Sequence, residues 1–86
     1  MSSAYQIFVD DEAIDVLMTL RSKDKHEIRS FIRSLAEDPF QEGDFPETDR
    51  EGRTIFTKLI GAYAVGYYPD HAVKEVKVFE IIRADS

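Results

Sequence analysis

Cysteine is absent from the 86-residue sequence. Disulfides and thiolate metal sites are therefore excluded, and the expected compartment is the reducing cytoplasm. The start of the chain also lacks a basic region followed by an apolar stretch, so no secretory signal is predicted. No apolar run approaches the roughly 20 residues that a membrane-spanning helix needs. We therefore expect a cytoplasmic protein that does not enter a membrane.

Internal repeats and low-complexity tracts are missing as well. The chain length suits one small domain with a single core, so residues 1–86 are expected to form one domain. Apolar residues make up 43% of the sequence, which is too much for a disordered chain and ordinary for a folded one. The acidic residues do not follow the spacing of a known calcium loop. No metal and no other cofactor is expected.

The net charge of −6 is concentrated in one segment. Residues 37–51 hold seven acidic side chains and one arginine, a balance of −6, so the rest of the chain sums to zero. Residues 21–33 hold five basic and two acidic side chains, a local balance of +3. This pattern predicts an acidic loop attached to a body with one basic helix edge. Acids beside an RNA site must point away from it or move on binding.

A short strand and an amphipathic helix are predicted at the start of the chain. Residues 4–9 (AYQIFV) combine aromatic and β-branched side chains, which is typical of a strand. Asp10 or Asp11 can then cap a helix, whose dipole favours negative charge at its first turn. The apolar stripe expected on this helix consists of Ile14, Leu17, Met18 and Leu20.

A second helix follows after a few residues, which predicts a helical hairpin. Asp24 and Glu27 have the spacing of a capping box, with Asp in place of Ser or Thr. The helix should end before Pro39, because the residue ahead of a proline avoids the α region. Its apolar stripe has the spacing i, i+3, i+4, i+7 and consists of Ile28, Phe31, Ile32 and Leu35.

Three strands are predicted in the second half, at residues 54–60, 63–68 and 75–83. Gly61 and Ala62 suit a tight hairpin turn, and PDHAVK suits a wider one. The preceding segment, DPFQEGDFPETDREGR, is predicted to be a loop. The fold class is therefore α+β in the order β-α-α-β-β-β, with an antiparallel meander and a helical pair on one face. Both faces of the last strand mix apolar and charged residues, so alternation does not settle which is buried.

The combined pattern resembles a known family. The helix exit LAEDPF, the Gly-containing loop ending in GR, and the run IGAYAVGYYPDHAVKEVKVFEII are similar to the RelE/ParE toxin superfamily of bacterial toxin–antitoxin modules. The resemblance extends from Tyr5 to Asp85. It implies a compact microbial RNase-like fold, a cognate antitoxin as partner, and action on messenger RNA at the ribosome or on DNA gyrase.

The resemblance also implies catalytic residues. RelE-type nucleases place a lysine on the first strand of the meander, which Lys58 matches, and an arginine after the last strand, where Arg83 is the nearest candidate. Metal-independent RNA cleavage needs groups that move protons and cations that hold the phosphorane charge. His71 can do acid–base work near neutral pH, and Arg53 can supply further positive charge. A turn histidine is more often a solvated surface residue, and a lysine on a strand can simply extend to solvent.

Other side chains are candidates for binding RNA. Tyr63 and Tyr67 can stack on bases, and Lys25 and Arg29 can contact phosphates. Each has a plainer interpretation. Aromatic residues on a small sheet usually pack in the core, and charged helix residues usually form a solvated face.

Two other functions stay open. Ala62 and Ala64 flank Tyr63, where RelE-type nucleases hold an arginine. A non-enzymatic binding module of the same fold, acting on gyrase or only on its antitoxin, is therefore the alternative to a ribosome-dependent endoribonuclease. A structural role is a third interpretation, with a partner covering the sheet edge. A monomer or a small homo-oligomer is expected.

Overall fold

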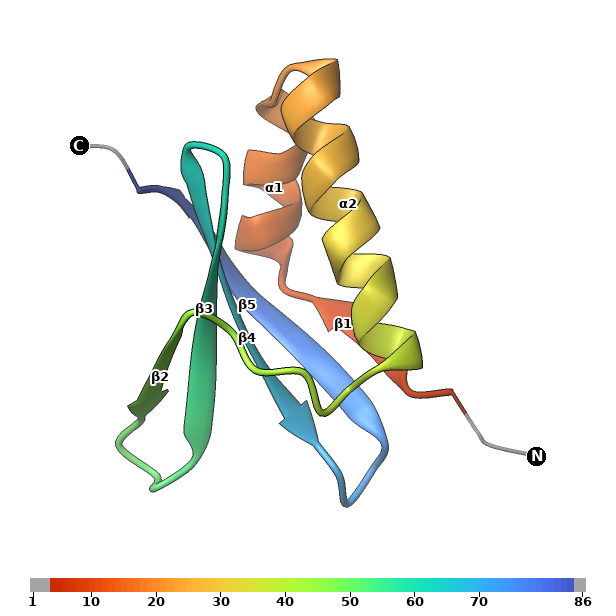
Figure 1. Cartoon of the computed structure of the whole chain (residues 1–86), viewed down its shortest axis with the longest axis vertical. Helices are drawn as coiled ribbons and strands as arrows, with labels where there is room; N and C mark the ends of the chain where they lie inside the picture. Colours follow the sequence, from red (N-terminus) through yellow and green to blue (C-terminus); the bar gives the residue numbers. More distant parts are fainter. Residues whose placement is uncertain (1–3, 85–86) are drawn as a thin grey trace.

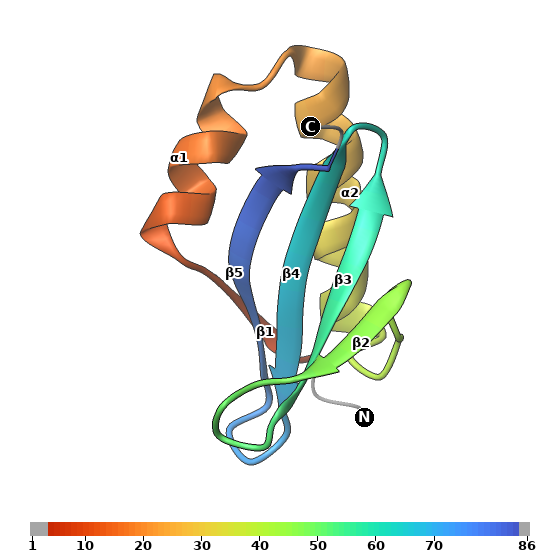
Figure 2. The same cartoon turned by 90° about the vertical axis from the view of Figure 1, so that its left-hand side faces the viewer.

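A mixed sheet of five strands, with two helices on one face, forms the described part of the chain, residues 4–84, in the computed structural model (Figures 1 and 2). Asp85, where the family resemblance ends, lies outside the described residues. The elements are β1 (Gln6–Val9), α1 (Asp11–Thr19), α2 (Ser22–Glu37), β2 (Phe45–Thr48), β3 (Thr54–Ile60), β4 (Tyr63–Asp70) and β5 (Glu75–Arg83).

The strand order across the sheet is β1-β5-β4-β3-β2. β1 runs parallel to β5, and the other neighbouring strands are antiparallel. The helices pack mainly on β5 and β1, so β3 and β2 lie at the sheet edge farther from them (Figure 1). This arrangement confirms the predicted α+β fold, including the helical hairpin and the meander.

The acidic segment contains a strand that the sequence did not predict. Phe45–Thr48 pairs antiparallel with β3, from Phe45 opposite Thr57 to Thr48 opposite Thr54. All four residues of β2 are exposed, so no apolar alternation marks the strand. Backbone pairing with β3 forms it, and Pro46 is tolerated because β2 is an edge strand.

α2 confirms its predicted apolar stripe and C-terminal end but begins earlier than predicted. Ile28, Ile32 and Leu35 are buried, and the helix ends at Glu37. It starts at Ser22, so Asp24 lies in the first turn instead of at the cap, and the predicted capping box is wrong. Arg21 takes the N-cap position without a side-chain cap, and its Nε lies 3.7 Å from Oδ2 of Asp24.

The apolar stripe predicted for α1 is partly wrong. Ala13 is the buried residue of this helix, whereas Ile14 and Met18 are exposed. Leu17 and Leu20 pack against the core as predicted, whereas Ala13 and Val16 take the places expected for Ile14 and Met18. A small residue at the closest point lets α1 approach β5, and this is invisible to a count of large apolar side chains.

Asp10 occupies the N-cap position of α1, as predicted, but its side chain makes no capping hydrogen bond. Its backbone N–H donates to the carbonyl of Val78 at 2.9 Å. Asp10 therefore continues the pairing of β1 with β5 by one residue before the helix begins.

A bulge in β5 shifts its register on β4. Gly66 pairs with Glu80 and Tyr67 pairs with Val78, so Phe79 has no partner residue. A bulge of this kind adds one residue to one strand, and the side chains beyond it change faces. The mixed character of β5 in the sequence results from this extra residue.

Burial along β5 follows the bulge. Val76 and Val78 are fully buried before it and Ile81 is buried after it, whereas Glu80 and Ile82 are exposed. The core also contains Ile28, Ile32 and Leu35 of α2 and Tyr63, Val65 and Tyr67 of β4. The helix side of the sheet is therefore the inner face.

Gly66 is required by the bulge. A Cβ at this position would come within 2.7 Å of the Phe79 ring. We expect Gly66→Ala to lower the free energy of unfolding by about 1–3 kcal/mol, the usual range for overpacking. Urea unfolding of Gly66→Ala in the Phe79→Ala background is the control, since the penalty should shrink once the ring is gone. Equal penalties in both backgrounds would show that the ring is not the cause.

Candidate functional site

Lys58 is held at the inner face of β3 by the acidic segment. It pairs with Val65 of β4, and its Nζ lies 3.8 Å from Oδ1 of Asp44. Oδ2 of the same carboxylate accepts a hydrogen bond from the backbone N–H of Leu59 at 2.8 Å. The backbone N–H of Asp44 donates to the carbonyl of Thr57 at 2.8 Å. The acidic segment is thus attached to β3 on both sides of Lys58.

Gly43 makes this attachment possible. A Cβ at Gly43 would lie 2.7 Å from the carbonyl oxygen of Thr57 and 3.0 Å from its carbonyl carbon. These are backbone atoms of a paired strand, which cannot move aside as a flexible side chain can. A residue without a side chain therefore lets Asp44 reach Lys58.

Arg83 lies on the same face as Lys58. It pairs with Tyr63 at the end of β5, and its guanidinium lies 5.6 Å from the centre of the Tyr63 ring. Tyr63 and Val65 project to the same side of β4, and so do their partners Arg83 and Lys58. The backbone positions of Lys58 on β3 and Arg83 on β5 differ by two interstrand spacings across the sheet and by two residues along the strands, so they lie roughly 12 Å apart. The long side chains of Lys58 and Arg83 can therefore approach neighbouring phosphates of one RNA strand.

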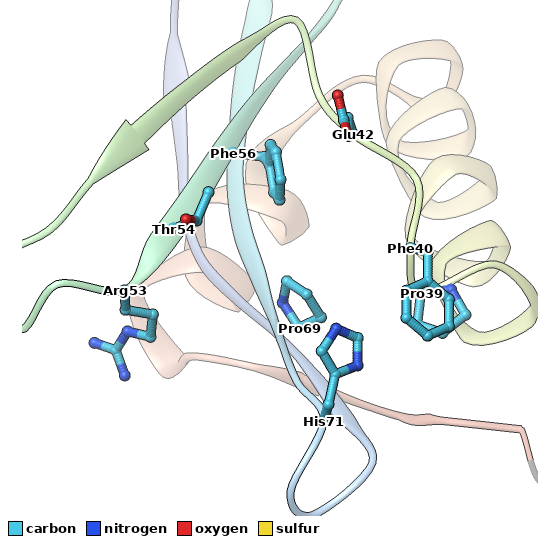
Figure 3. Close-up of a pocket in the computed structure, with 8 residues that line it drawn as sticks. All are labelled: Pro39, Phe40, Glu42, Arg53, Thr54, Phe56, Pro69 and His71. Carbon is cyan, nitrogen blue, oxygen red and sulfur yellow. The ribbon is translucent and has the colours of Figure 1, made fainter.

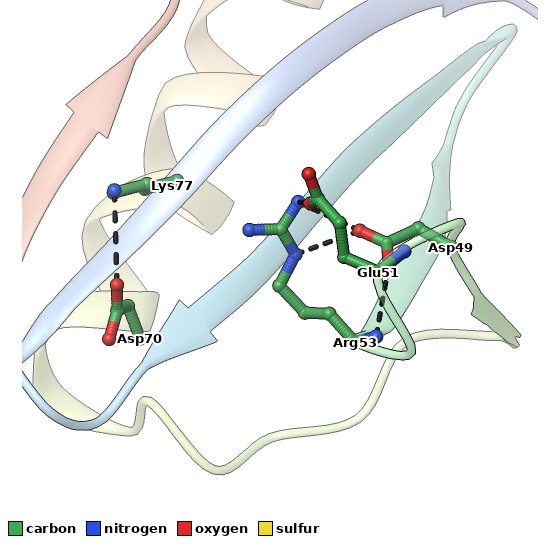
Figure 4. Close-up of polar contacts among 5 residues, drawn as sticks. All are labelled: Asp49, Glu51, Arg53, Asp70 and Lys77. Carbon is green, nitrogen blue, oxygen red and sulfur yellow. Dashed lines mark hydrogen bonds and ion pairs between the residues drawn. The ribbon is translucent and has the colours of Figure 1, made fainter.

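Arg53 precedes β3 and is engaged by two carboxylates (Figure 4). Its Nε donates to Oδ2 of Asp49 at 2.8 Å, and its NH2 group donates to Glu51 at 2.7 Å. Its guanidinium also lies 4.1 Å from the centre of the Tyr68 ring. The hydrogen bond that Asp49 accepts from the backbone N–H of Arg53 holds the pKa of Asp49 below its usual value. The side-chain hydrogen bond to Asp49 raises the pKa of Arg53.

His71 joins three segments that are distant in the sequence. It lies in the turn after β4, and its Nδ1 shares a 2.8 Å hydrogen bond with the hydroxyl of Tyr5. Its ring stacks on Phe40, with the ring centres 4.7 Å apart and the planes 16° from parallel. Phe40 belongs to the acidic segment and Tyr5 precedes β1, so His71 connects both to the β4–β5 turn.

A pocket of about 370 Å³ lies beside His71 (Figure 3). Phe56 and Pro69 contribute apolar surface, and Arg53 belongs to the lining. The guanidinium of Arg53 points away from the His71 ring (Figure 3). The remaining residues of the lining are Pro39, Phe40, Glu42 and Thr54.

The predicted catalytic residues therefore form two groups. Lys58 and Arg83 share one half of the inner face, whereas Arg53 and His71 line the pocket at the other end of the sheet. Lys58 is level with Val65, and the five residues from there to Asp70 span roughly 16 Å. His71 lies beyond Asp70, so it cannot act on a phosphate held by Lys58.

Tyr67 is a core residue. Its ring is fully buried between Phe31 and Phe56, whose centres lie 5.4 Å and 5.7 Å away. Its hydroxyl donates to the carbonyl of Gln41 at 3.1 Å, which adds a further link to the acidic segment. Tyr63 is also buried, at 9% exposure. Burial leaves neither ring a free face for a base, which fits their plainer interpretation.

Lys25 and Arg29 lie one turn apart on α2, and Arg29 is exposed. They belong to the helical layer, whereas Lys58 and Arg83 belong to the sheet. Residues 4–84 contain no group of three or more potential metal ligands. None of the helices within these residues is long and apolar enough to cross a membrane.

The acids that engage the cations are the residues that sequence reasoning missed. We expected acids beside an RNA site to point away from it or to move on binding, and Asp44, Asp49 and Glu51 point at the candidate cations. The spacing Asp-x-Glu-x-Arg over residues 49–53 is a local signal for the Arg53 contacts. Asp44 and Lys58 are far apart in sequence and carry no such signal.

Burial gives Tyr67 a measurable pH dependence. Desolvation, assisted by the charge of Asp44, raises its pKa from 10.0 to about 12. Because the pKa of Tyr67 is raised in the folded state, its neutral hydroxyl contributes to the free energy of unfolding. That contribution is complete below pH 10 and is lost as the pH rises toward 12. Between pH 8 and pH 11 the wild type should lose about 1.4 kcal/mol more unfolding free energy than Tyr67→Phe. Urea unfolding at both pH values measures this, with Tyr68→Phe as control, and identical losses in wild type and Tyr67→Phe would contradict it.

Comparisons with known proteins bear on the fold. No protein-family model matches the chain, and no curated protein sequence matches it either. A chain of the archaeal RelE–RelB complex from Pyrococcus horikoshii superposes with a TM-score of 0.81 at 14% identity, over 95% of this chain and 97% of that one.

Two bacterial structures agree. A chain of the toxin–antitoxin complex RelBE2 from Mycobacterium tuberculosis gives a TM-score of 0.75 at 18% identity, over 93% of this chain and 98% of that one. The isolated RelE toxin of E. coli gives a TM-score of 0.75 at 15% identity, over 96% of this chain and 87% of that one. The chain therefore has the fold of RelE toxins, as the sequence pattern predicted.

Proposed function

We propose that this protein is the toxin of a toxin–antitoxin module, that it cleaves messenger RNA on the ribosome, and that an antitoxin protein is its partner. The likeness to RelE structures, which in the archaeal complex extends over 95% of this chain and 97% of the other, is the observation that carries the proposal. The position of Lys58 and Arg83 on one face of the sheet supports it.

Charge stabilisation is the chemistry that these two side chains offer. The 2′-OH of a ribose passes its proton to water, and its oxygen attacks the adjacent phosphate to form a phosphorane with additional negative charge. The P–O5′ bond then breaks, which leaves a 2′,3′-cyclic phosphate and a 5′-hydroxyl that takes up a proton from water. An ammonium from Lys58 and a guanidinium from Arg83 would stabilise that charge in the transition state. His71 is too distant to serve the same phosphate, so this proposal assigns it no part in the proton transfer.

The ion pair of Lys58 with Asp44 must open for phosphate to bind. The side chains of Lys58 and Asp44 are 37% and 40% exposed. Ion pairs this accessible to water contribute about 0–1 kcal/mol. A phosphate can therefore replace the carboxylate of Asp44 at little cost in free energy. The acidic segment weakens RNA binding by this small amount and does not prevent it.

A second function is favoured by a specific observation. Arg53 is committed to Asp49 and Glu51, and Ala64 is buried beside Tyr63, where an arginine would lie in a RelE-type nuclease. A binding module that acts through protein contacts needs none of these cations. The candidate target in that case is gyrase or the antitoxin alone.

Transcript cleavage in a purified translation system tests the first function. Wild-type protein should cleave messenger RNA, and Lys58→Met should lower the rate by about 10²-fold, the usual effect of losing one group that stabilises transition-state charge. Lys77→Met is the matched control, because Lys77 is also 37% exposed and also lies near an acid, 3.9 Å from Asp70. The cleavage rate of Lys77→Met should stay within about twofold of the wild-type rate.

Two outcomes would count against this assignment. Growth arrest by the wild type without any transcript cleavage would favour the binding module. Cleavage that is equally fast in wild type and Lys58→Met would remove Lys58 from the site.

Removal of the acid should have the opposite effect. Asp44→Asn frees Lys58 while an amide oxygen can still accept the Leu59 N–H. We expect this variant to bind a short single-stranded RNA more tightly, as measured by fluorescence anisotropy. The slope of the logarithm of the binding constant against the logarithm of the salt concentration should become steeper by about 0.7, the value for one additional phosphate contact. Asp15→Asn on α1 makes the same change in net charge at a site remote from β3. Equal gains in the two variants would mean that only net charge matters.

A further inference from the structure

A second depression lies at the C-terminal end of α2, and Lys58 is not among the residues that line it. Its volume is about 420 Å³, and Tyr5 and Phe40 are among the residues that line it. Ala36 and Pro39 contribute apolar lining, and Glu37 contributes a carboxylate. This depression is the largest of the described pockets and takes no part in the proposed RNA chemistry.

The electrostatics of this depression favour a cation from two independent sources. The last carbonyl groups of a helix carry partial negative charge, and the last turn of α2 holds no basic residue that would offset it. Glu37 and Asp38 add two exposed carboxylates at the same end. Acids at a helix C-terminus oppose the dipole, so this placement disfavours the isolated helix and favours a cation bound at this end.

The aromatic walls are held in position. The rings of Tyr5 and Phe40 lie 6.4 Å apart at an angle of 58°. Phe40 is 71% exposed, and one face of its ring stacks on the ring of His71. His71 also shares a hydrogen bond with the hydroxyl of Tyr5. An exposed phenylalanine fixed in this way offers a π surface, and aromatic faces beside carboxylates bind organic cations.

The kind of cation follows from the lining. A phosphate or a nucleic acid would be repelled by Glu37 and Asp38. Two carboxylates fall short of the ligand set that Mg²⁺ or Ca²⁺ needs. A planar guanidinium fits best, because it can stack on Phe40 and donate paired hydrogen bonds to a carboxylate.

We propose that this depression receives an arginine side chain from a partner polypeptide. The surface next to it indicates the surrounding partner sequence. From the pocket the acidic segment continues to β2, with Glu42 and Glu47 exposed and Phe45 53% exposed. A partner segment that carries basic and apolar residues around the arginine would complement this surface in charge and in hydrophobicity. The site is separate from Lys58 and does not depend on RNA cleavage.

Titration of ¹⁵N-labelled protein by NMR tests this proposal, with the peptide Ac-Ala-Leu-Arg-Leu-Ala-NH2 as the probe. The amide signals of residues 36–38, Phe40 and Tyr5 should shift and reach saturation. The same peptide with citrulline, a neutral isostere of arginine, should bind at least about tenfold more weakly, because its hydrogen bonds lose the assistance of charge.

Two double variants locate the effect. Glu37→Gln with Asp38→Asn should abolish the preference for arginine over citrulline. Glu12→Gln with Asp15→Asn removes the same charge from α1, whose two acids are exposed, and should preserve it. The ¹⁵N spectrum of each variant also reports whether it is folded. Equal affinity for the two peptides, signal shifts elsewhere, equal losses in the two double variants, or no binding at millimolar peptide would each overturn the proposal.

Discussion

The close contact of the acidic segment with β3 is the constraint on which the rest of this molecule depends. Gly43 lies against the Thr57 backbone because it has no side chain, and this places Asp44 where it bonds to the strand and faces Lys58. The Tyr67 hydroxyl anchors the same segment at Gln41. These contacts hold the part of the chain that joins Phe40 to β2, and Phe40 stacks on His71 and lines both larger pockets.

This attachment changes the meaning of the net charge. The excess of acid is not a separate appendage on a neutral body, because Asp44, Asp49 and Glu51 engage the cations that adjoin β3. An acidic chain can therefore keep a RelE fold and still carry a candidate phosphate contact, Lys58, that is paired with a carboxylate accessible to water. RNA binding in this account is an exchange of one anion for another. The acids at the start of the segment, at the end of α2, are not used in this exchange and suit a cationic partner.

The sequence predicted those parts of the fold in which local periodicity and packing agree. The stripe of α2 was correct because large apolar side chains recur there at the helix period. The three strands of the meander were predicted as runs rich in aromatic and β-branched side chains, and β4 extends beyond the predicted 63–68 to Asp70. Other parts depend on features that periodicity does not carry. β2 is exposed along its whole length, α1 packs through Ala13, and the bulge at Phe79 reverses the alternation of β5. At the candidate site, Lys58 was predicted from the sequence and remains a prediction, and its pairing with Asp44 depends on a tertiary contact that the sequence does not show.

The central claim is that RNA phosphate and Asp44 compete for Lys58. A crystal structure of the protein with a short single-stranded RNA tests it most directly. The account predicts a phosphate oxygen within hydrogen-bonding distance of the Lys58 Nζ, about 2.7–3.2 Å, with the Asp44 carboxylate turned away and Arg83 near the adjoining phosphate. RNA bound elsewhere while the ion pair of Lys58 with Asp44 stays closed would contradict it.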